Sequence, residues 1–219
     1  MKLLLATRSQ DKVAEIAKIL AVVPDLELVS LMDEKIEPLA EEEGIERYST
    51  FEGNAEAKAR YFAERSGLPV VADDSGLVVD ALDGKPGVHS KRFAPGSGEI
   101  SGEERDRANN EHLLALLGDL ELSGRTARYV CVAAFIREGD ETRTFRGEAE
   151  GLILGRPRGH GGFGYDPLFY DQKLGKTFAE SSRFEKNDRS HRGKAFRALA
   201  EHLRSGAAAK GTGPRGPNR

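Results

Sequence analysis

The chain has 219 residues, of which 38% are hydrophobic and 32% are charged, and its formal net charge is −3. This length allows one α/β domain or two small lobes around a cleft, and we expect a single domain. The composition is compatible with a packed core under a charged surface and argues against wholesale disorder. A net acidic chain lacks the global positive field that holds a nucleic-acid backbone, so no polymeric nucleic acid is expected as a partner.

The single cysteine, Cys131, has no partner for an internal disulfide and lies in an apolar run, where it reads as a small buried side chain. The apolar run at residues 3–6 is too short for a signal peptide. No stretch approaches the roughly 20 apolar residues of a membrane span. We therefore expect a cytoplasmic protein with no membrane partner.

In chain order, residues 3–6 predict a strand. A helical pattern follows it, with apolar side chains at i, i+3, i+4 and i+7, namely Val13, Ile16, Ala17 and Leu20. The polar loop between them places backbone N–H groups at the start of the helix, where an anion is favoured. Its residues are Thr7, Arg8, Ser9, Gln10, Asp11 and Lys12.

Residues 26–31 predict a second strand, and the acidic segment 37–46 follows it. A bare acidic run is most often a solvated loop. Residues 51–65 predict a helix that turns Ala55, Ala59 and Phe62 inward and carries Glu52, Asn54 and Lys58 on its other faces.

Residues 68–72 predict an apolar strand that runs into Asp73 and Asp74, and residues 77–82 predict another. Two adjacent aspartates are costly there unless one, turning out of the sheet edge, meets a cation or a substrate proton. If the strand persists, the two side chains point in opposite directions, so one can serve the scaffold and the other a site. The alternative is an Asp-Ser-Gly turn between two strands.

Ser101 and Glu104 have the spacing of a capping box and open a predicted helix that ends before Gly118. Residues 127–137 and 142–150 predict a β-hairpin. A glycine-rich loop occupies residues 159–167, and the last helix starts near Ser190. From residue 205 the composition predicts a flexible tail, which leaves residues 1–204 as the folded domain.

The glycine-rich loop and the basic segment behind it carry further candidate site residues. The loop combines a permissive backbone with two aromatic residues and an acid, and the basic segment gathers Lys186, Ser190, His191, Arg192 and Lys194. Each feature taken alone has an ordinary structural explanation. The loop could be a long turn, and the basic segment could be the solvated start of a helix. Their joint occurrence with a carboxylate-rich metal candidate and a Thr-x-x-x-x-Lys loop favours a function.

Seven stretches, in this order, together resemble a known family. They are Ala6-Thr7 with Lys12, Thr50-Phe51-Glu52-Gly53-Asn54-Ala55 with Lys58, Ala72-Asp73-Asp74-Ser75-Gly76-Leu77, Pro86-Gly87-Val88 with Ser90 and Arg92, Gly161-Gly162-Phe163-Gly164-Tyr165-Asp166-Pro167, Thr177-Phe178-Ala179-Glu180, and Glu185-Lys186-Asn187 with Ser190-His191-Arg192-Gly193. They resemble the inosine/xanthosine triphosphate pyrophosphatases, which remove noncanonical purine nucleotides from the nucleotide pool. The resemblance spans residues 1 to about 204.

The resemblance implies an α/β fold with an elongated central mixed sheet, flanked by helices, in two lobes around a nucleotide-binding cleft. It implies Mg²⁺, a homodimer, and hydrolysis of ITP, dITP and XTP to the monophosphate and pyrophosphate, which prevents misincorporation into DNA and RNA. Asp74 matches the general base and metal-associated carboxylate, and either Glu41 or Glu42 matches the acidic metal ligand. The first loop departs from the family, which usually has Thr-Gly-Asn where this chain has Thr7-Arg8-Ser9.

These residues support a mechanism in which Mg²⁺ bridges carboxylates and phosphates, and Asp74 deprotonates a water for in-line attack on the α-phosphorus. Lys12 and Lys58 are candidates for triphosphate contacts, and Ser75 also lies beside the substrate. In the loop around Gly164, Phe163 or Tyr165 can stack on the purine, and Asp166 can accept from a ring N–H. Fixed donors would select a 6-oxygen over the 6-amino group of adenine, the candidates being Lys186, His191 and Arg192.

Three alternatives remain at this point. The Maf-type nucleotide pyrophosphatases also begin with an apolar strand and a Ser-containing loop, but they do not predict the loop from Phe163 to Pro167 or the run Ser190-His191-Arg192. A non-catalytic nucleotide sensor would keep the pocket, although the presence of Asp74 weighs against it. A nucleic-acid-binding protein would use the basic segment and the tail, and the acidic net charge weighs against that.

Overall fold

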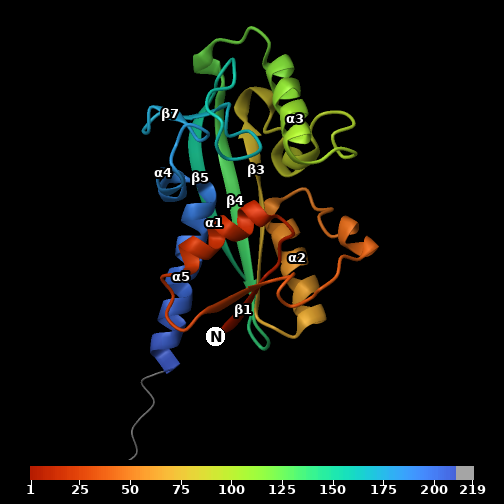
Figure 1. The fold of residues 1–219 in the computed structure, drawn as a ribbon, viewed down its shortest axis with the longest axis vertical. Coiled ribbons are helices and arrows are strands. Elements are labelled where there is room, and N and C mark those ends of the chain that lie inside the picture. Colours follow the sequence, from red (N-terminus) through yellow and green to blue (C-terminus); the bar gives the residue numbers. More distant parts are fainter. Residues whose placement is uncertain (211–219) are drawn as a thin grey trace, which may run out of the picture.

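One mixed sheet of seven strands forms the centre of the molecule (Figure 1). The structure is a computed structural model, and it describes residues 1–210. In spatial order the strands are β2 (Glu27–Ser30), β1 (Lys2–Leu5), β3 (Val70–Val79), β4 (Thr126–Ile136), β5 (Arg143–Ile153), β6 (Phe169–Asp171) and β7 (Lys176–Thr177). The first three are parallel to one another, and every later pairing is antiparallel. The predicted α/β fold with a mixed sheet is confirmed.

The helices of the described part are α1 (Gln10–Leu20), α2 (Phe51–Ser66), α3 (Gly102–Leu117), α4 (Arg183–Arg189) and α5 (His191–Lys210), with short 3₁₀ turns at 40–44, 80–82, 87–92 and 122–124. α5 continues past residue 204, where we placed the end of the domain. Residues 211–219, most of the predicted tail, lie outside the described part. None of the helices described has the length and apolarity to cross a membrane.

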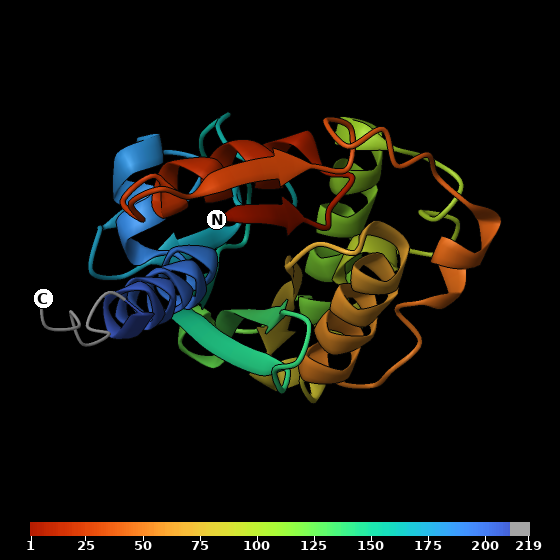
Figure 2. The ribbon, with the colours of Figure 1, turned by 90° about the horizontal axis from the view of Figure 1, so that it is seen from below.

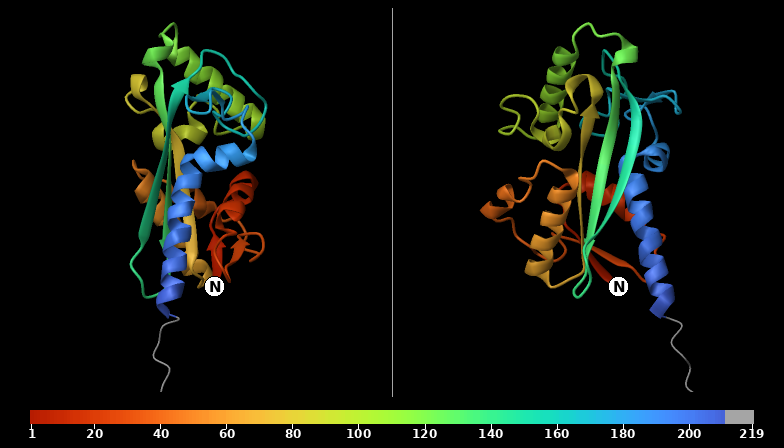
Figure 3. Two further views of the ribbon diagram at one scale, coloured as in Figure 1. Left: turned by 90° about the vertical axis from the view of Figure 1, so that its left-hand side faces the viewer. Right: turned by 180° about the vertical axis from the view of Figure 1, so that it is seen from behind.

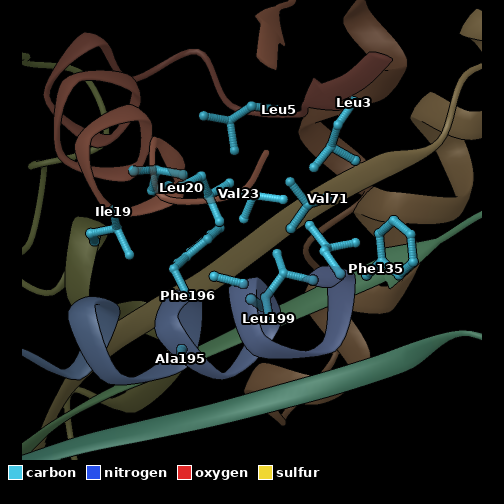
Figure 4. Close-up of a cluster of buried hydrophobic side chains, with 14 of the residues drawn as sticks. Leu3, Leu5, Ile19, Leu20, Val23, Val71, Phe135, Ala195, Phe196 and Leu199 are labelled. Atoms are coloured by element: carbon cyan, nitrogen blue, oxygen red, sulfur yellow. The ribbon is translucent and has the colours of Figure 1, made fainter. Parts of the chain in front are cut away.

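Side-chain alternation along the central strands gives the sheet two apolar faces. On one face, Leu3, Leu5 and Val71 pack against α1 and α5, where Phe196 and Leu199 are fully buried (Figure 4). On the other face, Leu4, Ala72 and their neighbours pack against Ala55, Ala59 and Phe62 of α2, as the helical pattern predicted. α2 and α5 therefore lie on opposite sides of the molecule, with β1 between them (Figure 2).

The long strands β3, β4 and β5 join two ends of the molecule (Figures 1 and 3). α1, α2, β1 and β2 surround one end. At the other end, α3 and the loops around β6 and β7 close a third apolar cluster, which contains Leu77, Tyr129, Phe169 and Phe178. Asp73 and Ser75 occupy the stretch of β3 between the two ends.

Three local predictions are wrong. Residues 70–79 form one continuous strand instead of the two predicted strands, and the alternative of an Asp-Ser-Gly turn is excluded, because β4 pairs with every residue of β3 from Val70 to Val79. β3 also lies between β1 and β4, so the aspartates do not turn out of a sheet edge. The capping box does not form: α3 starts after Ser101, but the left-handed φ of +60° at Gly102 redirects the chain, and the serine side chain caps no helix N–H.

Candidate functional site

Asp73 and Asp74 are neighbours on one strand and project to opposite faces of the sheet. Asp73 is 0% exposed, and its Oδ2 lies 2.9 Å from Nζ of Lys12 and 3.6 Å from Nε of Arg192. Burial opposes its ionisation, but Lys12, Arg192 and Lys58 outweigh that effect and hold the pKa of Asp73 well below its usual range. Asp73 is therefore a permanent anion that serves the scaffold.

Asp74 has a different environment, on the face covered by α2. Its Oδ2 accepts a hydrogen bond from Nδ2 of Asn54 at 3.0 Å, and its Oδ1 accepts one from the backbone N–H of Ser75 at 3.0 Å. No cation forms an ion pair with it within residues 1–210. Burial, reinforced by Glu46, raises the pKa of Asp74 to about 6 against the opposing effects of Lys58 and Asn54. A buried carboxylate with a raised pKa is suited to take up a proton near neutral pH.

Glu46 is the acid that the structure brings toward Asp74, and the sequence did not single it out. Its carboxylate pairs with the ammonium of Lys58 on α2, and its charge acts on both Asp73 and Asp74. The backbone N–H of Tyr48 donates to Oδ1 of Asn54 at 2.8 Å. Asn54 therefore connects Tyr48, two residues after the acidic segment, to Asp74 through the two ends of one amide.

Glu41 and Glu42, the predicted metal ligands, have other partners. Oε1 of Glu41 accepts a hydrogen bond from the hydroxyl of Tyr61 at 2.7 Å. Oε1 of Glu42 lies 2.8 Å from Nη2 of Arg8 and 3.0 Å from Nη1 of Arg65. In the described chain no hydrogen bond or ion pair joins either glutamate to Asp74.

The first loop keeps the start of α1 organised despite its departure from the family pattern. Ser9 is the N-cap, and its Oγ accepts from the backbone N–H of Lys12 at 3.4 Å. Oγ1 of Thr7 accepts from the backbone N–H of Ser9 at 3.2 Å. Gln10 and Asp11 start the helix with exposed side chains. The start of α1 therefore presents the backbone N–H groups to which the sequence analysis assigned an anion, apart from that of Lys12, which Ser9 caps.

Only a few of the predicted site residues line a cavity. A cavity of about 300 Å³ lies between the first loop and residues 30–38, and Thr7, Arg8 and Gln10 line it. A larger one of about 960 Å³ is lined by the chain start, the turn between β4 and β5, and residues 202–204 of α5. None of the predicted site residues lines the larger cavity.

A chain of ion pairs links the first helix to the basic segment through Glu15, which the sequence did not single out. Oε2 of Glu15 lies 2.6 Å from Nη1 of Arg192, and its Oε1 lies 3.0 Å from Nζ of Lys186. Arg192 also donates from Nη2 to Oγ of Ser75 at 3.0 Å. Glu15 follows Lys12 by three residues, a spacing that places both on one face of α1, and this spacing is the signal by which the sequence could have identified Glu15.

Phe163 and Tyr165, the two aromatic candidates of the glycine-rich loop, have different surroundings. The ring centroid of Phe163 lies 4.6 Å from Nζ of Lys186 and 5.7 Å from Cζ of Arg192, and the side chain is half-buried. Tyr165 lies in the third apolar cluster, and its hydroxyl donates to the carbonyl of Ser90 at 2.8 Å. Phe163 is therefore the aromatic face beside the basic segment.

Gly164, between these aromatics, is held on both sides of its backbone by α3. Its N–H donates to Oδ2 of Asp106 at 2.7 Å, and its carbonyl accepts from Nδ2 of Asn110 at 2.9 Å. Its φ of +64° lies in the left-handed region that favours glycine. The sequence predicted this loop but not its attachment to α3.

Asp166 and His191 are buried supports of this region. Oδ2 of Asp166 accepts from the backbone N–H of Phe163 at 2.9 Å and lies 2.6 Å from Nζ of Lys186. The ring of His191 stacks on Tyr129, with centroids 4.6 Å apart and planes 8° apart. Burial, with the charges of Arg192 and Lys186, lowers the pKa of His191 well below its usual value, so the imidazole is neutral.

The linked charges of the site contain more acids than cations. Four cationic side chains, Lys12, Lys58, Lys186 and Arg192, face five acidic ones, Glu15, Glu46, Asp73, Asp74 and Asp166. In residues 1–210 no three His, Cys, Asp or Glu side chains form a metal-binding group. Two neighbouring carboxylates, Asp74 and Glu46, suit Mg²⁺, which uses one or two carboxylates together with waters and substrate phosphates. A divalent cation would reverse the local acidic excess and allow a polyphosphate to bind.

Comparisons with known proteins show which family the whole chain resembles. The sequence profile of the Ham1 family matches residues 3–202. A dITP/XTP pyrophosphatase of Geobacter sulfurreducens is 48% identical over 202 residues, which cover 92% of this chain and 96% of that protein. A dITP/XTP pyrophosphatase of Thermus thermophilus is 44% identical over 206 residues, 94% of this chain and 93% of its own. The structure of a HAM1 protein from Coxiella burnetii superposes with a TM-score of 0.80 at 35% identity, covering 94% of this chain and 99% of that one.

Proposed function

The chain belongs to the Ham1 family, and we propose that it hydrolyses the noncanonical purine nucleoside triphosphates ITP, dITP and XTP to the monophosphate and pyrophosphate. The observation that carries the proposal is Asp74, a buried carboxylate of raised pKa without a cationic partner in the described chain, beside Lys58 and the charge of Glu46. The proposal includes Mg²⁺ as cofactor and a cytoplasmic homodimer, the latter from resemblance.

In the proposed reaction, Asp74 accepts a proton from the water that attacks the α-phosphorus. The new bond forms between that water oxygen and phosphorus, and the bond to the bridging oxygen of pyrophosphate breaks. Asn54 fixes the carboxylate by donating to its Oδ2. In the metal-free protein the raised pKa of Asp74 makes it a stronger base than an exposed aspartate.

Asp74 and Glu46 would hold Mg²⁺, with Glu46 in place of Glu41 or Glu42. When bound, the metal ion neutralises charge on the phosphates. Lys12 is available to the triphosphate because its side chain is 19% exposed and its ammonium has one salt-bridge partner in the described chain, Asp73, which leaves further N–H donors. The backbone N–H groups at the start of α1 add donors for the phosphate oxygens.

Base selection rests on Phe163 and the two cations beside it. Phe163 stacks on the purine, and Lys186 and Arg192 supply fixed donors for the 6-oxygen. Both cations are buried, so the 6-amino group of adenine would leave a donor unpaired in a dry site. The carboxylate of Asp166 holds the ammonium of Lys186 in place through an ion pair.

The purified protein with Mg²⁺ should release pyrophosphate from ITP, dITP and XTP much faster than from ATP, GTP or dTTP. Pyrophosphate and orthophosphate are measured separately. Orthophosphate as the first product would indicate a γ-phosphatase, and a preference for dTTP would favour the Maf-type alternative. Binding of ITP without any turnover would identify a sensor and end the proposal.

Glu46→Gln should raise the Mg²⁺ concentration for half-maximal activity at least about tenfold, because a ligand carboxylate is lost. Glu41→Gln is the matched control, since Glu41 contacts Tyr61 and not Asp74, and it should change that concentration less than twofold. The measurement is initial rate against Mg²⁺ at saturating ITP. An equal response of the two variants would remove Glu46 from the metal site.

Phe163→Ala should raise the KM for ITP about tenfold, because stacking of a base on an aromatic ring contributes about 1–3 kcal/mol. Tyr165→Phe removes only the hydrogen bond to Ser90 and should leave that KM unchanged while lowering the unfolding free energy by about 1 kcal/mol. Steady-state kinetics and urea unfolding check the pair. A larger KM effect at Tyr165 would reverse their roles.

A further inference from the structure

Arg8 lies in the first loop, beside the proposed phosphate site, yet its guanidinium contacts the acidic segment. Nη1 donates to the carbonyl of Ile36 at 2.6 Å. Nε and Nη2 donate to the two carboxylate oxygens of Glu42 at 3.2 and 2.8 Å, a bidentate arrangement. Three nitrogens of the Arg8 guanidinium therefore donate to residues 36–42.

Arg65 reaches the same carboxylate from α2. Its Nη1 donates to Oε1 of Glu42 at 3.0 Å, and its Nη2 donates to the carbonyl of Glu37 at 3.2 Å. Glu42 thus joins the first loop to α2 through two arginines, and both arginines also hold the backbone at residues 36 and 37. We call Arg8, Glu42 and Arg65 the arginine clamp.

The arginine clamp fixes one side of Glu46, and a second anchor fixes the other. Glu46 follows Glu42 by four residues, and two residues later the N–H of Tyr48 is bound by Asn54. Between these anchors, the carboxylate of Glu46 pairs with Lys58. The stretch that carries Glu46 therefore has little freedom to leave the neighbourhood of Asp74.

We propose that Arg8 is a positioning residue: with Glu42 and Arg65 it holds residues 36–46 so that Glu46 stays beside Lys58 and Asp74, and it does not bind the triphosphate. The effect of Arg8 on catalysis rests on the proposed function, whereas its contacts with residues 36–42 do not. The family pattern described above has a glycine at this position, and glycine has no side chain to form these contacts. The inference replaces the expectation that Arg8 contacts phosphates.

Hydrogen exchange of peptides that cover residues 36–46 tests the clamp without any nucleotide. Arg8→Met and Glu42→Gln should each speed exchange of these peptides about three- to tenfold in the metal-free protein. Arg128→Met is the matched control, because Arg128 pairs with Asp80 at 2.7 Å and its side chain is 37% exposed, the same fraction as Arg8. This control should leave residues 36–46 unchanged.

Kinetics of the same variants test the consequence. Arg8→Met should raise the Mg²⁺ concentration for half-maximal rate at least threefold, while the KM for ITP at saturating Mg²⁺ stays within twofold of the parent. Unchanged exchange in both clamp variants overturns the proposal, and so does a raised KM with unchanged exchange, since Arg8 would then bind phosphate. Faster exchange with unchanged Mg²⁺ dependence overturns the positioning of Glu46. If the protein does not hydrolyse ITP at all, the proposed function fails, whereas the exchange result still decides whether the clamp exists.

Discussion

Asp74→Asn is expected to lower kcat for ITP by about a thousandfold or more while leaving the fold intact. Removal of a general base costs roughly 10²–10⁴ in rate, and Asp74 is also a proposed metal carboxylate. The neighbouring hydrogen bond need not be lost, because the asparagine oxygen can still accept from Nδ2 of Asn54. Pyrophosphate release under saturating ITP and Mg²⁺ measures the effect.

The same variant should unfold at the same or a higher temperature in the absence of metal. Burial raises the pKa of Asp74 to about 6, so the ionised side chain opposes folding at pH 7 by up to roughly 3 kcal/mol. For an acid with a raised folded pKa, this penalty grows as the pH rises from about 4 to about 6 and is constant above. A variant that retained the parent rate would overturn the mechanism, whereas an inactive variant with a much lower melting temperature would leave only a structural role.

Much of the fold could be predicted because its signals are local. The helical pattern at Ala55, Ala59 and Phe62 and the hairpin of β4 and β5 need only side-chain periodicity and turn residues. The continuity of β3 could not be predicted, because it depends on pairing with β4 some 60 residues later, which overrides the turn tendency of Asp-Ser-Gly. The division of labour between Asp73 and Asp74 follows from that continuity.

The candidate site was predicted in its residue types more completely than in its contacts. The sequence identified the acidic segment, but the partners of Glu41, Glu42 and Glu46 depend on how the chain folds back on α2. The place of Arg8 in the first loop suggests a phosphate ligand, whereas in the structure its donors point to the carbonyl of Ile36 and the carboxylate of Glu42. Contacts between distant segments decide these roles, and no local pattern encodes them.

Asp73→Asn should have the opposite phenotype from its neighbour and lower the free energy of unfolding by about 3–5 kcal/mol at pH 7. Its carboxylate is 0% exposed and compensates Lys12 and Arg192. Removing one partner of a buried ion pair leaves an uncompensated charge in a medium that solvates it poorly. Arg192 retains its ion pair with Glu15, so Lys12 is the main cation left without a partner. Urea unfolding measures the difference.

The pH dependence of the unfolding free energy distinguishes the loss of the Asp73 charge from a simple packing defect. The pKa of Asp73 is lowered in the folded state, so the stability it contributes is fully present above the unfolded value of about 4 and is lost as the pH falls below it. The gap between parent and Asp73→Asn should therefore narrow from pH 7 to pH 3. Asp80→Asn, which breaks an exposed pair with Arg128, is the control and should cost less than about 1 kcal/mol at pH 7. A gap at Asp73 that stays constant with pH would mean that its shape, and not its charge, holds Lys12 and Arg192 in place.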